Sequence, residues 1–550
     1  MNAWNSIRLL TLALMPSLSL VGCGESEGGG DLESDPAAPE GVTVLARGGQ
    51  FHGVNGIHFG PDGRLYLASV VTPAIAAIDP DSGEILELWG EAEGVRSPDD
   101  IAFGPDGSAY WTDILHGLVT RRSPDGTHSV VADLGEGVNP ITFSDDGRLF
   151  VSQCFMDDQL YEVDPEGKGQ ARLINGDLGP GCGLNGMDWG SADGKLYGPR
   201  WFEQVVVRVD VATGAIETVA SGFGVPAAVK FDSQGRLHVL DALRGQVVRV
   251  DLDSGAQEIV ANLQAGLDNL AFGPDDRLFV SSYADGFIVE VMSPTENRTV
   301  VEGGINMPGG LTLHQGRLYV ADFFALRGLD PYTGEEQYTV RDVIGFSSQG
   351  SVMSVHSMGE NLVLTSWFDN TVKIWDPSTD SVITTFQAAA PIDAIGFDRD
   401  VVVTEYGTGE VVRFSTAEPE SRTTLASGID GPAGLATLGG DIYVSENHAG
   451  RILKLLPDGA TEVLADDLAD PEGLAIANGL LYVVEAGAGR LISIDLETGT
   501  KLLVAEGLET NVPASGASPK TMIFNGVAVS EDRAYVSGDK INVIYTVPLN

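Results

Sequence analysis

The sequence is poor in basic residues. Its 550 residues contain 32 Lys and Arg against 78 Asp and Glu, which gives a formal net charge of -46. Because nucleic acid is itself a polyanion, this balance excludes DNA and RNA as default partners. No phosphate-binding loop or zinc motif indicates nucleotide chemistry either. The charge is typical of a soluble surface, and the alternative is a role in attracting cations or basic partners.

Long helical patterns are also lacking. No extended stretch carries apolar residues at helical spacing, whereas 70 Gly and 27 Pro supply many turns. Short segments with alternating apolar residues lie between these turns, as in DIYVSE and RILKL. The sequence therefore predicts an all-β protein, and its length predicts two domains.

The first residues have the pattern of an export signal. An apolar run, 9–21, is too short to be a standard membrane-spanning helix. It ends in LVGC (20–23), which resembles the lipobox of bacterial lipoproteins. The resemblance implies a signal peptide at 1–22, a lipid on Cys23 and, since Gly24 follows, sorting to the outer rather than the inner membrane. An ordinary secretory signal is the alternative.

Residues 23–41 are acidic, rich in Gly and Pro, and almost without apolar side chains. Such a composition predicts a flexible tether. We therefore expect an exported, lipid-anchored protein that contacts the membrane through its N-terminal lipid only.

A single unit recurs about every 43 residues through the rest of the chain. It starts at an apolar anchor, continues through a tight turn such as GPDGR, and ends its third strand in an Asp…Gly turn such as DLDSG. The anchors are Ile57, Ile101, Ile141, Met187, Val229, Leu270, Leu311, Met353, Ile395, Leu435, Leu474 and Val527. Because one ring usually has four to eight blades, these predict two six-bladed propellers, at 42–296 and 297–550.

The two ends of this array predict how the rings close. Residues 42–47 resemble a lone outer strand, and the chain ends after a third strand. We expect 42–47 to complete the blade anchored at Leu270, and 298–301 to complete the blade anchored at Val527, which would hide the sheet edges. The alternative is that 42–47 closes the last blade of the chain, which makes one ring discontinuous.

The repeats resemble two known propeller families. AGLATLGGDIYVSENHAGRI (433–452) and EGLAIANGLLYVVEAGAGRL (472–491) look like NHL repeats, and NGMDWGSADGKLY (185–197) resembles the senescence-marker-protein/gluconolactonase family. Both families form six-bladed propellers. Repeat motifs of this kind specify a fold far more strongly than an activity.

The residue two positions before each anchor should line the channel mouth. Among these twelve positions, the candidate ligands are Asn55, Asp99, Asn139, Asn185 and Asp268 in the first ring, and Asp393, Glu472 and Asn525 in the second; the others hold Ala227, Gly309, Ser351 and Ala433. Such oxygen ligands suit Ca²⁺ or another divalent cation. The alternative is that these side chains only cap turns.

The gluconolactonase family implies a metal held by a glutamate, asparagines and an aspartate at such positions. Asn185 matches that family best and Asp268 resembles its aspartate, but the family glutamate is missing from the first ring. This departure puts catalysis in doubt more than metal binding.

Two further features concern chemistry and covalent structure. Glu446 ends a second strand and His448 follows it, which resembles streptogramin lyases, where Glu and His act in elimination. The alternative is that Glu446 braces a neighbouring loop and His448 lies on the surface. Cys154 and Cys182 fall on the same face of neighbouring blades and are expected to form a disulfide in an exported protein.

Three functions follow from these patterns. The first is a binding lipoprotein whose channel mouths hold a protein, glycan or small-molecule ligand. The second is a metal-dependent lactonase or ester hydrolase in the first ring, and the third is a lyase in the second.

Overall fold

The computed structural model describes residues 38–71, 73–514, 519 and 521–549. These residues form twelve four-stranded antiparallel sheets, and the described helices are three short 3₁₀ turns, at Glu91–Glu93, Ala486–Ala488 and Asp539–Ile541. The prediction of two tandem six-bladed propellers is confirmed. None of the helices in these ranges is long and apolar enough to cross a membrane.

The first propeller comprises six consecutive sheets. Blade by blade they are β2–β5 (Ile57–Phe59, Leu65–Ser69, Ala74–Ile78, Ile85–Trp89), β6–β9 (Pro98–Phe103, Ala109–Asp113, Leu118–Arg122, His128–Asp133), β10–β13 (Val138–Phe143, Leu149–Gln153, Leu160–Val163, Arg172–Asn175), β14–β17 (Asp188–Gly190, Lys195–Arg200, Val205–Val209, Ile216–Ser221), β18–β21 (Pro226–Phe231, Leu237–Asp241, Gln246–Val250, Gln257–Asn262) and β22–β25 (Leu267–Phe272, Leu278–Ser282, Ile288–Ser293, Glu296–Val301).

The second propeller takes its last strand from the start of the chain. Its sheets are β26–β29 (Leu311–His314, Arg317–Asp322, Ala325–Leu329, Glu336–Arg341), β30–β33 (Ser354–Met358, Asn361–Ser366, Thr371–Asp376, Ser381–Gln387), β34–β37 (Pro391–Phe397, Asp400–Glu405, Glu410–Phe414, Arg422–Ser427), β38–β41 (Pro432–Leu438, Asp441–Glu446, Arg451–Leu455, Thr461–Ala465), β42–β45 (Pro471–Ala477, Leu480–Glu485, Arg490–Asp495, Lys501–Glu506) and β46–β48 with β1 (Val527–Val529, Arg533–Gly538, Val543–Pro548, Thr43–Arg47).

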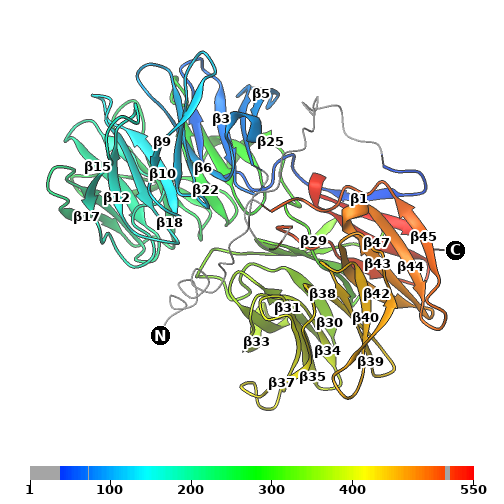
Figure 1. Ribbon diagram of the computed structural model, residues 1–550. Helices are drawn as coiled ribbons and strands as arrows, with labels where there is room; N and C mark the ends of the chain where they lie inside the picture. The colour runs from blue at the N-terminus through cyan, green and yellow to red at the C-terminus, as the bar shows by residue number, and fades with distance from the viewer. Residues whose placement is uncertain (1–37, 72, 515–518, 520, 550) are drawn as a thin grey trace.

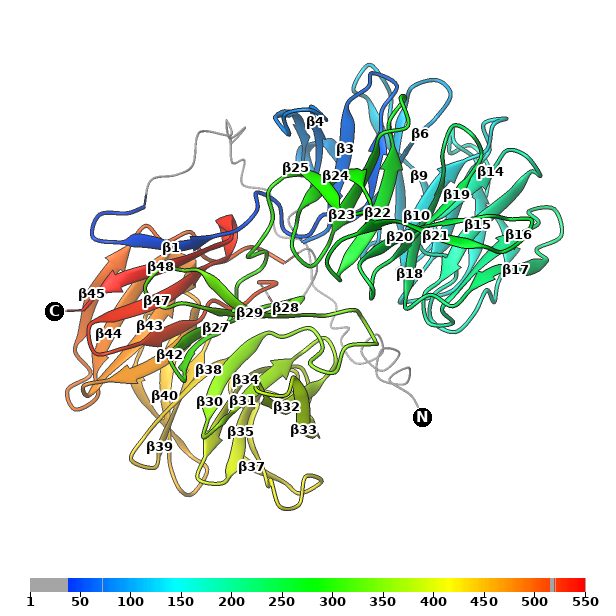
Figure 2. The ribbon, with the colours of Figure 1, turned by 180° about the vertical axis from the view of Figure 1, so that it is seen from behind.

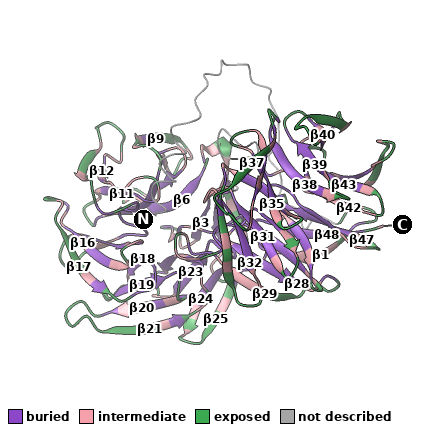
Figure 3. Ribbon diagram, turned by 90° about the horizontal axis from the view of Figure 1, so that it is seen from below, coloured by how far each residue is buried: buried purple, intermediate pink, exposed green. Residues whose placement is uncertain are grey.

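Inner strands pack from blade to blade around each ring. β2 contacts both β6 and β22, and β26 contacts both β30 and β46, so each set of six sheets closes on itself (Figure 1). The strands become more exposed from the channel toward the outside of each blade. Every residue of the second strand β3 is buried, whereas the outer strand β17 is mostly exposed (Figure 3). Alternating apolar residues on the inner strands therefore fill the space between neighbouring blades.

Our preferred closure of the rings is wrong, and the alternative is correct. β1 pairs with β48, with Val44 opposite Tyr545, and completes the second propeller (Figure 2). β25 instead pairs with β24 across a tight turn, so the blade anchored at Leu270 closes locally. A short hairpin costs less chain entropy than pairing with a distant strand. The boundary between the propellers consequently lies after Val301 rather than between residues 296 and 297, and 42–47 does not belong to the first propeller.

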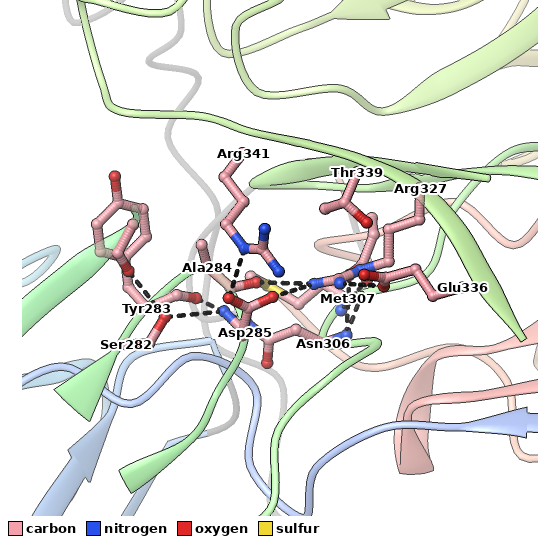
Figure 4. Close-up of polar contacts among 12 residues, drawn as sticks. Ser282, Tyr283, Ala284, Asp285, Asn306, Met307, Arg327, Glu336, Thr339 and Arg341 are labelled. Atoms are coloured by element: carbon pink, nitrogen blue, oxygen red, sulfur yellow. Dashed lines mark hydrogen bonds and ion pairs between the residues drawn. The ribbon is translucent and has the colours of Figure 1, made fainter. Parts of the chain in front are cut away.

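A buried ion-pair network joins the two propellers (Figure 4). The side chain of Arg327 is 1% exposed and donates from Nε to Asp322 at 2.5 Å and from Nη2 to Asp285 of the first propeller at 2.8 Å. Arg341 donates to the same Asp285 carboxylate at 2.6 Å. Removing one partner would leave a buried charge uncompensated, so this network ties the sixth blade of the first propeller to the first blade of the second.

Candidate functional site

The predicted ring of Asn and Asp side chains in the first propeller is held in place through its backbone. The Asn55 carbonyl accepts from Ser281 Oγ at 2.7 Å, the Asp99 carbonyl accepts from Gly56 N at 2.7 Å, and the Asn139 carbonyl accepts from Thr112 Oγ1 at 2.6 Å. Each bond joins neighbouring blades. The start of each inner strand is therefore fixed next to the following one around the channel.

Asp99 and Asp268 are the two carboxylates of this ring. Burial raises the pKa of Asp99 well above its usual range, and the charges of Asp268 and Asp100 raise it further. Burial and the charge of Asp100 raise the pKa of Asp268 to about 8. Within the described part of the chain, neither carboxylate receives a hydrogen bond, and neither do the side chains of the ring asparagines.

The adjacent carboxylate, Asp100, behaves differently. Its oxygens accept from Ile101 N at 3.0 Å, Asn269 Nδ2 at 3.2 Å and Ile141 N at 3.2 Å, which join three blades. Burial raises the pKa of Asp100 as well, and the charge of Lys230 opposes this shift. Asp100 is thus a structural carboxylate, whereas its neighbour Asp99 has unused acceptors.

A metal at this ring would depend on amide oxygens as well as carboxylates. Among the described residues, no three His, Cys, Asp or Glu side chains are grouped closely enough to hold a metal ion. The ring offers Asp99 and Asp268, with amide oxygens from Asn55, Asn139 and Asn185. A hard cation that accepts neutral oxygens and water as ligands fits this donor set.

A segment of the second propeller lies against this face of the first. Tyr283 follows β23 and donates its hydroxyl to the Asp342 carbonyl at 2.8 Å. Burial raises the pKa of Tyr283, and the charges of Asp342 and Asp268 add to this shift. Trp201 Nε1 donates to the Ile344 carbonyl at 2.9 Å. The sequence did not predict the roles of Tyr283 and Trp201, because repeat patterns carry no signal for contacts between the two rings.

The disulfide prediction agrees with the structure. Cys154 and Cys182 are joined and belong to the apolar cluster that also contains Trp201 and Val343. The Phe155 ring packs edge-on against Trp201, and Phe202 stacks on Phe346 of the second propeller. The disulfide therefore lies beneath the aromatic side chains that receive the second propeller.

The corresponding mouth of the second propeller is small and largely apolar. Met307, Phe323, Met353, Ile392, Ile523 and Phe524 pack there, together with Val71 of the first propeller. The channel beneath holds a cavity of about 30 Å³. That space holds about two water molecules. It is too small for a ligand of ordinary size.

Each of the three predicted metal ligands of the second propeller has at least one partner, although Glu472 Oε1 has none in the described part of the chain. His356 Nε2 lies 2.9 Å from Asp393 Oδ1. Burial is the largest single effect and opposes ionisation of both groups, but the partner's charge and the hydrogen bonds together outweigh it, so the pKa of His356 is raised and that of Asp393 is lowered. Glu472 accepts from Asn525 N at 2.5 Å, and Asn525 Oδ1 accepts from Asn511 N at 3.0 Å.

Glu446 makes the bracing contacts of the structural alternative. Its Oε1 accepts from Asp430 N at 2.9 Å, and its Oε2 accepts from Arg451 Nε at 2.7 Å. Glu485 repeats the arrangement one blade later, with Ala469 N and Arg490. These carboxylates hold the loop before the inner strand of their own blade, which leaves Glu446 poorly placed to act as a general base beside His448.

Comparisons with known proteins add no family. No family model matches the chain, and no curated protein matches it. Among solved structures, the extracellular domain of the two-component system BT4673 from B. thetaiotaomicron shares 10% identity over 88% of this chain and 73% of that one, with a TM-score of 0.31. A protein described as a gluconolactonase shares 18% identity over 49% of this chain and 95% of its own, with a TM-score of 0.36. At these values the similarity assigns no activity, and the fold rests on the twelve sheets.

Proposed function

We propose that this protein binds a small polar ligand, together with a divalent cation, at the channel mouth of the first propeller. The observation that carries the proposal is the contrast between neighbouring carboxylates. Asp100 accepts from three donors, whereas the side chains of buried Asp99 and partly buried Asp268 receive no hydrogen bond among the described residues. A bound cation would neutralise both carboxylates and remove the cost of burying them.

The chemistry of the ring favours Ca²⁺ over softer metals. Two carboxylates and three amide oxygens are hard ligands, and Ca²⁺ takes six to eight oxygens, so positions would remain for water or ligand oxygens. Tyr283 and the adjoining segment of the second propeller stand beside these positions. They supply a polar and aromatic wall that suits a sugar or another hydroxylated small molecule.

A lactonase of the gluconolactonase type is the second candidate for the same ring. It is favoured by Asp268, because a carboxyl with a pKa of about 8 can exchange a proton near neutral pH. Asn185 and the NGMDW motif support the same family. A bound cation would polarise a lactone carbonyl there.

Calcium titration tests the proposal directly. Isothermal titration of the mature, metal-free protein should show binding, and Asp268→Asn should weaken it about tenfold to a hundredfold, since one charged ligand is lost. Asp275→Asn is the matched control, because Asp275 is an exposed turn carboxylate in the loop that follows β22, in the same blade as Asp268. Absence of calcium binding at millimolar concentration, or equal affinity in Asp268→Asn, would contradict the proposal. Turnover in a panel of lactones would favour the hydrolase over the binding protein.

We also propose that the mature chain is a lipoprotein attached through Cys23, a residue that lies outside the described part together with the signal peptide and most of the tether. Cys23→Ala should abolish incorporation of radiolabelled palmitate and release the protein from the membrane fraction. Unchanged membrane association in Cys23→Ala would refute a lipid anchor.

A further inference from the structure

Three polar side chains from separate loops form a chain at the mouth of the second propeller. Tyr406 follows β35, Asp430 precedes β38 and His448 follows β39. The Tyr406 hydroxyl lies 2.5 Å from His448 Nε2, and His448 Nδ1 lies 3.1 Å from Asp430 Oδ1. Of these residues only His448 stands out in the sequence, because the other two come from neighbouring loops that the repeat pattern does not connect.

The backbone is shaped to permit this approach. Gly431 has a φ of +72°, and a Cβ added there would lie 3.1 Å from His448 Cγ and 3.2 Å from Tyr406 Cε2. A larger residue would therefore be strained and would push the two rings apart. The rings meet edge to face, with centroids 5.4 Å apart.

The chain of side chains borders an apolar cluster that is buried except for the surface of its rim, where Trp367, Tyr406 and Met522 are partly exposed. Tyr406 packs on the cluster that contains Ile392 and Phe524, and its ring lies edge-on to Phe524 at 5.8 Å. His448 remains 29% exposed and Asp430 66% exposed, so solvent reaches the polar side. An apolar group resting on this surface would lie beside the Tyr406 hydroxyl.

The order of atoms defines a role for each group. With Nδ1–H donated to the Asp430 carboxylate, His448 presents an unprotonated Nε2 to the Tyr406 hydroxyl. A base oriented by a carboxylate and bonded to a hydroxyl is the arrangement that activates hydroxyl nucleophiles.

We propose that Tyr406 is a nucleophile toward esters with an apolar acyl group, with His448 as its base and Asp430 as the positioning residue. Tyr406 Oη would form a bond to the ester carbonyl carbon while its proton moves to His448 Nε2. The bond from that carbon to the leaving oxygen then breaks, and the leaving group takes the proton or departs as an anion. The products are an acyl-tyrosine and the alcohol or phenol. This site is separate from the ring of the first propeller and does not depend on a cation.

The probe is p-nitrophenyl butyrate, with peptide mapping of the butyryl adduct. Tyr332 is the internal control, because it is 71% exposed and lies beside Arg533 rather than a histidine. At pH 7.5 the adduct should form at Tyr406 at least about tenfold faster than at Tyr332, since a general base contributes factors of this size or more. Tyr406→Phe should abolish the burst of nitrophenolate.

Further variants separate activation from packing. His448→Phe keeps a ring against Gly431 and should reduce the rate at Tyr406 to that at Tyr332. Asp430→Ala should slow acylation, and Asp430→Asn, which retains an acceptor for Nδ1–H, should restore most of the rate. Equal labelling of Tyr406 and Tyr332, an unchanged rate in His448→Phe, or an adduct on His448 itself would overturn the proposal. If His448→Phe does not fold, the burst in the parent and its loss in Tyr406→Phe decide the matter.

Discussion

The mouths of the two channels are built from equivalent positions of the same repeat, yet one is polar and the other is largely apolar. In the first propeller, Asp99 is buried and Asp268 partly buried, and neither carboxylate has a hydrogen-bond donor among the described residues. In the second, Asp393 has His356 as an ion-pair partner, and apolar side chains fill the mouth. A ring of polar residues in a repeat is therefore a candidate cation site only where neighbouring blades donate no hydrogen bonds to its oxygens.

The propellers also differ in how they close. All four strands of the blade anchored at Leu270 come from one continuous segment, whereas the last blade of the second propeller takes β1 from the other end of the chain. The second ring is thus complete only when both ends of the chain have been synthesised. Its stability should depend on a few residues near the N-terminus.

Removal of β1 should have the largest effect and should be confined to the second propeller. A mature chain that begins at Gly48 loses four paired positions on β48 and the buried Val42. At about 0.2–1 kcal/mol for each pair, and about 2 kcal/mol for the buried side chain, the free energy of unfolding should fall by about 4 kcal/mol. Hydrogen exchange followed by mass spectrometry should show faster exchange in β46–β48 and unchanged exchange in β2–β25.

A chain that begins at Glu40 is the matched control, because it keeps β1 and loses only the residues before it. Equal loss of protection in both propellers would mean that the rings unfold as one unit. No loss at all would contradict the closure by β1.

The closure error shows what the sequence could and could not predict. Turn residues and alternating apolar positions predict the blades, their anchors and the disulfide, since these depend on local chemistry and spacing. Residues 42–47 resemble every other outer strand, so their pattern cannot specify which free edge they join. Likewise, the residues next to Asp393 in the sequence do not show that it pairs with His356, because His356 lies on another blade. The residues next to Asp99 do not show that its carboxylate receives no hydrogen bond, because that depends on the neighbouring blades.

Breaking the His356–Asp393 pair should have the next largest effect. His356→Gln leaves Asp393 buried and charged with only neutral donors, among them Leu435 N at 2.8 Å. Loss of one partner of a buried pair costs about 3 kcal/mol, so the free energy of unfolding of the second propeller should fall by about that amount at pH 6. Chemical denaturation measures it, and the double variant His356→Gln/Asp393→Asn should recover part of the loss. A cost below about 1 kcal/mol would show that the charge of Asp393 does not depend on His356.

The smallest effect concerns Glu472, a carboxyl that is 1% exposed and whose Oε1 has no partner in the described part of the chain. Burial raises its pKa well above 4.5, and the charge of Asp539 adds to the shift. The folded state therefore retains a proton that the unfolded state releases above pH 4.5. Stability from this group is present below that pH and is lost as pH rises toward the folded pKa.

Glu472→Gln removes this titration without a change in shape. At pH 5 the free energies of unfolding of parent and variant should agree within about 1 kcal/mol, because a neutral acid and an amide are similar in polarity. From pH 5 to pH 8 the variant should become progressively more stable than the parent, as measured by urea denaturation at each pH. A constant difference across that range would mean that Glu472 is ionised throughout, as a carboxylate beside a bound cation would be. The same residue position would then hold a cation in both propellers, and the contrast between their mouths would disappear.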